Sequence, residues 1–184
     1  VPRGLGHAVA CARQAVGNGS FAVLLPDELM GDASLLTQMW KMHDAGGKHV
    51  VGLKQVPKSD VSAYGCVKTT GAPDKDGVVT VTGVVEKPAI NEAPSDLILI
   101  GRYVLSADMF DMLDTLAPAK GGEILLTDAL LMAANAGNLL GVVSGIDRHD
   151  TGTPMGWLQA VIEIALKRKD VGDELSTWLE GRFK

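Results

Sequence analysis

Two short apolar runs separated by a helical pattern constrain the fold of this chain most. Residues 21–27 indicate a buried strand that ends in Pro-Asp. Apolar residues at helical spacing follow over 35–45, and Gly46-Gly47 ends that helix before a second buried run at 49–53. This β-α-β order predicts parallel strands with a right-handed crossover, which is typical of α/β proteins.

The rest of the chain continues the alternation of strands and helices. Two β-rich segments, 64–68 and 78–86, flank a turn at 71–77 and predict a hairpin. Further strands are predicted at 97–105 and 139–143, and helices at 6–15, 106–116 (capped by Ser106), 127–136, 154–169 and 173–180. We expect a mixed, mostly parallel sheet with flanking helices, in a domain over 1–169 with a helical extension over 170–184.

Composition narrows the class of protein. Hydrophobic residues make up 46% of the 184 residues and charged residues 21%, as in an ordinary globular enzyme. The net charge of -5 makes nucleic acid and anionic membranes poor partners, and no apolar run approaches the ~20 residues of a membrane span. Cys11 and Cys66 lie outside any CxxC pair, so we expect two buried, reduced thiols in a cytoplasmic protein.

Charged residues close several of the predicted strands, where open α/β sheets bind their ligands. Asp27 could hold a metal–phosphate group, or it could merely cap a turn. Glu86 could accept sugar hydroxyls and Lys87 could reach a phosphate, although a solvated charge pair is the simpler reading. Asp150 lies near Asp147 and His149 without zinc spacing, so Mg²⁺ with oxygen ligands suits it better.

Two glycine-containing segments open helices. Gly4-Leu5-Gly6 allows close backbone approach to a nucleotide, but it lacks the full GxGxxG spacing. Gly121-Gly122 leads into the helix at 127–136, with Thr127 or Asp128 as the expected N-cap.

Seven blocks in this order resemble the bacterial UTP–glucose-1-phosphate uridylyltransferases, from Gly4 to about Arg168. They are GLGHAV (4–9), FAVLLPDEL (21–29), AYGCV (63–67), VVEKP (84–88), LILIGRYVL (97–105), GGEILLTDAL (121–130) and RHDTGTPMGWLQA (148–160). The resemblance implies a Rossmann-like nucleotide-diphospho-sugar transferase fold and transfer of UMP from UTP to glucose 1-phosphate, giving UDP-glucose and pyrophosphate.

The resemblance also implies roles for individual residues. The catalytic residues would be Asp27 and Lys87, and the metal would be Mg²⁺ on Asp27 and Asp150. Related enzymes form dimers or tetramers, so a homo-oligomer is expected by analogy. The substrate-binding residues would be Gly4 for uracil, Tyr64, Gly65, Glu86 and Gly101 for the sugar, and Lys87 for the sugar phosphate.

Two departures from the family pattern qualify this expectation. The glycine-rich segment with its Arg and Lys, and the Gln that precedes the GLGHA block, are absent from this sequence. We therefore expect little or no turnover from this chain alone. The alternatives are another sugar-1-phosphate nucleotidyltransferase, a non-catalytic sugar-nucleotide-binding relative, or a dinucleotide-dependent oxidoreductase, for which no GxGxxG turn is present.

Overall fold

The computed structural model describes residues 2–119 and 121–182, which form two compact units. The sheet unit contains the residues up to Leu24 together with Asp32–Gly145. The ribbon unit contains Leu25–Gly31 and the residues from Ile146 onward. This division differs from the predicted one at 169/170, because the helix that begins at Pro154 belongs with the last helix in one unit.

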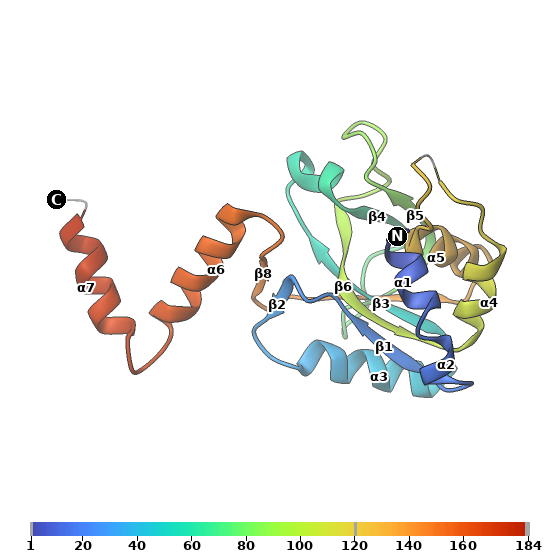
Figure 1. The fold of residues 1–184 in the computed structure, drawn as a ribbon, viewed down its shortest axis with the longest axis horizontal. Helices are drawn as coiled ribbons and strands as arrows, with labels where there is room; N and C mark the ends of the chain where they lie inside the picture. Colours follow the sequence, from blue (N-terminus) through green and yellow to red (C-terminus); the bar gives the residue numbers. More distant parts are fainter. Residues whose placement is uncertain (1, 120, 183–184) are drawn as a thin grey trace. The chain divides into compact units, whose positions relative to one another are not determined.

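The sheet unit is built on a six-stranded mixed sheet in the order β1-β6-β3-β7-β5-β4 (Figure 1). One further pairing, between Cys66 of β4 and Ile98 of β6, joins the last strand back to the second. The strands are β1 (Phe21–Leu24), β3 (His49–Gln55), β4 (Gly65–Thr70), β5 (Val78–Glu86), β6 (Leu97–Leu105) and β7 (Leu139–Val143).

Strand directions confirm the predicted mixed sheet and correct the expected share of parallel pairs. β1 and β3 both pair antiparallel with β6, so they run parallel to each other but are not neighbours. Among the strands described, only β3 and β7 form a parallel pair. The sequence pattern shows which segments are strands, but not that 97–105 inserts between the first two.

Burial follows position in the sheet. The first five residues of β3 and most of β6 are buried, because neighbouring strands and packed helices cover them on both sides. β1 is only partly buried, in contrast to the predicted fully buried strand, because it pairs with β6 alone among the described strands and lies at the sheet edge.

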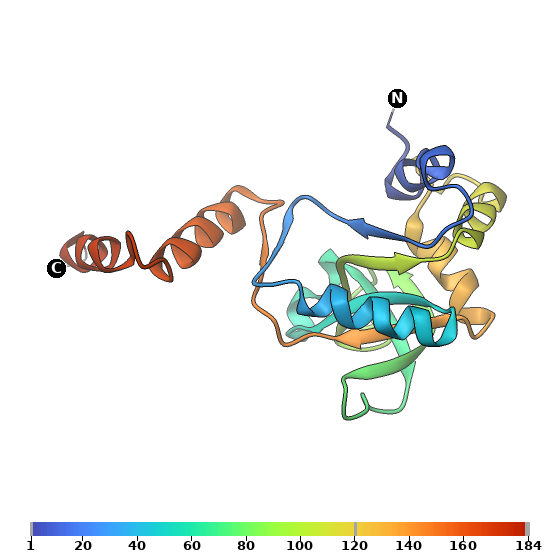
Figure 2. The same cartoon turned by 90° about the horizontal axis from the view of Figure 1, so that it is seen from below.

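Helices cover the sheet on both sides (Figures 1 and 2). α3 packs on β3 and β6, whereas α1, α4 and α5 pack on one another and α5 covers β5. The helices of this unit are α1 (Leu5–Ala10), α2 (Arg13–Val16), α3 (Ser34–Gly46), α4 (Asp108–Thr115) and α5 (Leu126–Asn135), with a 3-10 helix η1 (Lys58–Ala63).

Helix ends depart from the predicted caps. α4 starts after Ala107 without a side-chain cap, and the Ser106 hydroxyl donates to the Gly47 carbonyl instead, at 3.4 Å. α5 starts after Leu125, so neither Thr127 nor Asp128 is its N-cap residue. The predicted end of α3 is confirmed: Gly47 adopts a left-handed conformation with φ 66°, which glycine accepts without cost.

The ribbon unit consists of a two-stranded antiparallel ribbon and two helices. β2 (Glu28–Met30) pairs with β8 (Arg148–Asp150), and α6 (Pro154–Leu166) and α7 (Gly172–Arg182) follow. The helix predicted over 154–169 is confirmed as α6, but only its residue Ala160 is buried, while Met155 and Trp157 are more than half exposed.

Candidate functional site

Glu86, the last residue of β5, lies beside Gly65, the first residue of β4, near the point where β4 also pairs with β6. The two residues are direct partners in the β4–β5 register, and the next residue of β4, Cys66, pairs with Ile98. A Cβ atom built on Gly65 would lie 3.3 Å from Glu86 Oε2, and 3.0 Å from a methyl of Leu99. The half-buried Glu86 carboxylate therefore lies over bare backbone that no other residue type would leave open.

Lys87 follows directly with an unusual backbone. Its φ of 43° is the only positive φ of a non-glycine residue among those described, and such a conformation costs of order 1–3 kcal/mol. The Lys87 amide donates to the Tyr64 carbonyl at 3.1 Å, which holds this conformation at the end of the ladder. The backbone thus changes direction between the half-buried Glu86 and the exposed Lys87, and the buried Pro88 follows.

The Glu86 carboxylate also affects the pKa of a neighbouring thiol, that of Cys66. Burial raises the pKa of the Cys66 thiol, and the Glu86 carboxylate raises it further. Cys66 is therefore a protonated core residue, as predicted. Cys11 is exposed rather than buried, because α1 ends before it and turns it outward beside His7.

Gly4 lies against the loop that leads into α5. Its φ is 88°, and a Cβ there would lie 2.9 Å from the Ile124 carbonyl oxygen. Backbone hydrogen bonds on either side, Gly6 N to Ile124 O at 2.9 Å and Ile124 N to Arg3 O at 2.7 Å, fix this approach. Both glycines of the GLG segment therefore have a packing role in addition to any part in nucleotide binding.

The remaining predicted sugar residues lie in the same unit. Tyr64 is half-buried and links η1 to β4. Gly101 is buried in the middle of β6, further along the strand than Ile98, the partner of Cys66. The structure thus brings Tyr64, Gly65, Glu86 and Lys87 together, and places Gly101 further along the adjoining strand.

One residue near Glu86 was not among the site residues expected from the sequence. Thr127, in the first turn of α5, has its methyl group 3.1 Å from the point where a Gly65 Cβ would lie. Its hydroxyl is buried and has no hydrogen-bond partner. The sequence signal was present, in the GGEILLTD block, but it was interpreted as a helix cap.

Asp27 and Asp150 converge in the ribbon unit. A Cβ on Gly152 would lie 3.1 Å from Asp150 Oδ1 and 3.2 Å from Asp27 Oδ2, so both carboxylates face the same point. The Asp27 carbonyl accepts from the Thr151 amide at 2.8 Å and from its hydroxyl at 2.9 Å. The β2–β8 register, in which Glu28 is the partner of Asp150, brings the two acids together.

A buried ion pair supports these acids. Arg148 donates from Nε and Nη2 to the two carboxylate oxygens of Glu28, and both side chains are less than a tenth exposed. The same Arg148 also donates to Asp150 Oδ2, at 3.2 Å. Neither Glu28 nor Arg148 was predicted, because nothing in the sequence indicates that the two charges pair across 120 residues.

The donor set suits a hard cation. Asp27 and Asp150 offer only oxygen, as Mg²⁺ prefers, and Mg²⁺ usually takes one or two protein carboxylates together with waters and phosphate oxygens. Across residues 2–119 and 121–182, no group of three or more His, Cys, Asp or Glu side chains is arranged to hold a metal. The pair therefore fits a cation that shares its ligands with a phosphate, and does not fit an all-protein cage.

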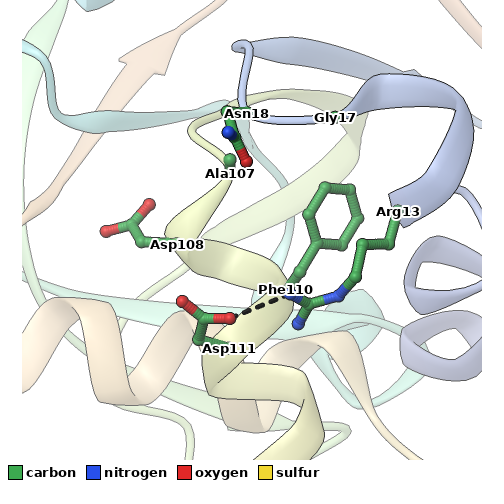
Figure 3. A pocket seen from close by; sticks show the side chains of 7 residues that line it. All are labelled: Arg13, Gly17, Asn18, Ala107, Asp108, Phe110 and Asp111. Atoms are coloured by element: carbon green, nitrogen blue, oxygen red, sulfur yellow. Dashed lines mark hydrogen bonds and ion pairs between the residues drawn. The ribbon is translucent and has the colours of Figure 1, made fainter.

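A separate pocket in the sheet unit contains none of the predicted residues (Figure 3). The Arg13 guanidinium lies 5.3 Å from the centre of the Phe110 ring and pairs with Asp111 at 2.9 Å. Tyr64, Gly65, Glu86 and Lys87 (the Glu86 corner) lie near Ile98, where β4 pairs with β6. β6 ends at Leu105, shortly before Ala107 of this pocket, so the two features lie toward opposite ends of that strand.

Comparison with known proteins agrees with this fold. The family model described as nucleotidyl transferase matches residues 1–167, and the chain belongs to this family.

The chain is also similar to individual proteins whose activity is named. The chain is 39% identical over its whole length to UTP–glucose-1-phosphate uridylyltransferase YngB of Bacillus subtilis (strain 168), and 37% identical over 97% of its length to the UTP–glucose-1-phosphate uridylyltransferase of Escherichia coli (strain K12). It spans 61% of the length of each of these relatives.

Solved structures show the same relationship. A UDP-glucose pyrophosphorylase in complex with UDP-glucose superposes with a TM-score of 0.85 at 33% identity, covering 91% of this chain and 64% of that one. A UTP-bound enzyme from Acinetobacter baumannii gives 0.84 at 33% identity, covering 95% and 60%. Among the described residues, no helix combines the length and apolar character that crossing a membrane requires.

Proposed function

We propose that this chain is the sugar-binding part of a UTP–glucose-1-phosphate uridylyltransferase, which transfers UMP from UTP to glucose 1-phosphate. The observation that carries the proposal is the corner where the Glu86 carboxylate lies over the bare backbone of Gly65, with Lys87 held beside it in a strained conformation. The names of the relatives, and the UDP-glucose and UTP in the titles of similar structures, supply the substrates.

The proposed roles follow from the chemistry of each group. Glu86, an acceptor when ionised, takes hydrogen bonds from sugar hydroxyls, and Gly65 lets the ring approach the backbone. The Lys87 ammonium neutralises the sugar phosphate. Gly4 contributes backbone to the uracil, and Tyr64 and Gly101 complete the surroundings of the sugar.

The reaction needs no covalent enzyme intermediate. An oxygen of the glucose 1-phosphate phosphate forms a bond to the α-phosphorus of UTP, the bond from that phosphorus to the β-phosphate oxygen breaks, and pyrophosphate leaves with that electron pair. The protein's tasks are therefore orientation and charge neutralisation. Asp27 and Asp150 would hold Mg²⁺, which stabilises negative charge on phosphate oxygens.

We also propose that the protein forms a homo-oligomer and is located in the cytoplasm. The exposed apolar side chains of α6, among them Met155 and Trp157, support a homo-oligomer, because a surface of this kind is rarely left open to water. The free thiols of Cys11 and Cys66 support a reducing compartment such as the cytoplasm.

Calorimetric titration with UDP-glucose and Mg²⁺, beside a pyrophosphate-release assay, tests the function. We expect wild type to bind UDP-glucose and Asp27→Ala to bind it more weakly when Mg²⁺ is present, with no difference when the metal is removed. Wild-type chain that is folded by circular dichroism and yet fails to bind UDP-glucose would contradict the proposal.

A further inference from the structure

A serine hydroxyl extends the short pairing of β4 with β6. Among the described residues, these two strands pair at one position, Cys66 with Ile98. Next to that pair, the Ser95 hydroxyl donates to the Val67 carbonyl at 2.6 Å and accepts from the Leu97 amide at 3.0 Å. Because a hydroxyl can donate and accept at once, Ser95 connects the first residue of β6 to β4 where the strands themselves do not pair.

Ser95 also lies near the end of the loop that begins at the Glu86 corner. After Glu86 closes β5, residues 87–96 lead to the start of β6. The first residue of this loop is held where the Lys87 amide donates to the Tyr64 carbonyl at 3.1 Å, and the far end is held by the Ser95 hydroxyl. Both acceptor carbonyls belong to β4 or to the residue just before it, so one strand holds both ends of the loop.

The Glu86 corner depends on the spacing between β4 and β6. A Cβ built on Gly65 would lie 3.0 Å from a methyl of Leu99 in β6 and 3.3 Å from Glu86 Oε2. Gly65 is only two residues from Val67, the β4 residue that Ser95 holds. Any movement of β4 relative to β6 therefore changes the space in front of Gly65, and binding groups must stay within about 0.5 Å of their productive geometry.

We propose that Ser95 is a positioning residue for sugar binding. Its hydroxyl ties β4 and the loop after Glu86 to the start of β6, and thereby holds the Glu86 corner in the geometry that the hexose and its phosphate require. The inference rests on the proposed function, since the ligand is the one proposed for this corner. Ser95 acts through the position of the corner and makes no contact with the ligand.

The residue after Ser95 offers a matched control. The Asp96 carboxylate accepts from Gln55 Nε2 at 2.8 Å, and the Asp96 carbonyl accepts from the Val56 amide at 3.0 Å. These bonds tie the same stretch of chain to the end of β3, which carries none of the corner residues. Gln55→Ala therefore removes one side-chain hydrogen bond next to Ser95, on the strand that should not matter for the sugar.

The test is calorimetric titration of UDP-glucose and of UDP into wild type, Ser95→Ala, Ser95→Thr and Gln55→Ala. Ser95→Ala should bind UDP-glucose roughly fivefold more weakly, about the net value of one hydrogen bond, and should bind UDP as wild type does. The loss is modest because the pairing of β4 with β5 remains intact. Ser95→Thr keeps the hydroxyl and should restore UDP-glucose binding, and Gln55→Ala should bind both ligands as wild type does.

Combination with Glu86→Gln separates positioning of the corner from a general structural role. If Ser95 acts through the Glu86 corner, Ser95→Ala should weaken UDP-glucose binding less in the Glu86→Gln background than in wild type, because the group that it positions is already impaired. Ser95→Cys keeps the size of the side chain and weakens both hydrogen bonds, so it takes the place of Ser95→Ala if that variant does not fold.

The outcomes distinguish failure of the inference from failure of the proposed function. Equal binding of UDP-glucose by wild type and Ser95→Ala, equal weakening of UDP and UDP-glucose, or the same loss in Gln55→Ala or in both Glu86 backgrounds would overturn the role of Ser95 and leave the proposed function standing. Failure of folded wild-type chain to bind UDP-glucose would remove the proposed function and the inference together.

Discussion

The Glu86 corner of the sheet unit and the acid pair of the ribbon unit are held by different means. At the corner, main-chain pairing of β4 with both β5 and β6 fixes Gly65 and Glu86 within a buried sheet. In the ribbon unit, two three-residue strands carry Asp27 and Asp150, and one buried ion pair ties those strands together. A site on a sheet core tolerates side-chain changes nearby, whereas a site on a short ribbon depends on individual contacts.

The largest effect is expected from breaking the ion pair of the ribbon unit. Arg148→Met removes the guanidinium that bonds both oxygens of the buried Glu28 carboxylate, which should cost about 3–5 kcal/mol of stability in that unit. Hydrogen exchange should show loss of protection at the Gly31 and Thr151 amides, which close the ribbon. The Ser144 amide of the sheet unit serves as the internal control.

The double variant Glu28→Met with Arg148→Met sharpens that result. Replacing both charges by apolar side chains of similar size also removes the buried carboxylate that the single variant leaves without its guanidinium, so most of the lost protection should return. Equal loss in the single and double variants would show that the ion pair does not hold the ribbon.

A second large effect is expected at Gly156, in the first turn of α6. A Cβ there would lie 2.0 Å from the Asp150 carbonyl oxygen, which is backbone and cannot rotate away. Gly156→Ala should therefore destabilise the ribbon unit by about 1–3 kcal/mol, as overpacking does, and displace the Asp150 strand. Thermal unfolding and Mg²⁺-dependent binding of UDP-glucose measure the two consequences.

Gly181→Ala is the matched control for this substitution. Gly181 lies in α7 of the same unit with nothing within 4 Å of a Cβ, so alanine should stabilise the helix slightly. If Gly156→Ala were as stable as Gly181→Ala, the close approach of α6 to Asp150 would be wrong.

A smaller effect is expected from the strained backbone of Lys87. Lys87→Gly and Lys87→Ala both remove the ammonium group, so both should weaken binding of glucose 1-phosphate. Glycine accepts the φ of 43° and alanine does not, so the free energy of unfolding should be about 1 kcal/mol higher for the glycine variant. Urea denaturation of the two variants checks this, and equal values would show that no strain is stored at this position.

The smallest effect is expected from pH, through the buried His49. Burial lowers its pKa, the nearby His43 lowers it further, and Asp108 opposes both. The Ser106 amide donates to His49 Nδ1 at 3.3 Å, which also favours the neutral ring. As pH falls below the ordinary histidine pKa of about 6.5, His49 binds a proton in the unfolded chain and stays neutral in the folded chain. The free energy of unfolding therefore declines until the pH reaches the lowered pKa of His49 in the folded chain.

Comparison with His49→Gln isolates this contribution. The wild-type free energy of unfolding should fall more steeply with decreasing pH below about 6.5 than that of the variant, which cannot titrate at this position. Parallel pH profiles would show that His49 is not the group responsible.

Much of the sheet could be predicted from sequence, because apolar runs must be buried whatever their neighbours are. The segments 97–105 and 139–143 are strands with the predicted bounds. The order of strands could not be predicted, since β6 pairs with β1 and β3 through contacts distant in the sequence.

The candidate site divides in the same way. Glu86 and Lys87 could be singled out because charged residues at a strand end are visible in the sequence. Thr127 could not, because the difference between a capping hydroxyl and an unused one depends on where α5 begins, and a shift of one or two residues decides it. The Glu28–Arg148 pair depends on the register of two very short strands, which carry almost no sequence signal.

One comparison of ligands tests the central claim most directly: titration of UDP-glucose and of UDP into wild type and Glu86→Gln. If Glu86 accepts hydrogen bonds from the hexose, the variant should bind UDP-glucose at least tenfold more weakly, as expected for a hydrogen bond to a charged group. It should bind UDP, which has no hexose, as tightly as wild type does. Equal binding of UDP-glucose by the two chains, or equal weakening of both ligands, would contradict the assignment of this corner to the sugar.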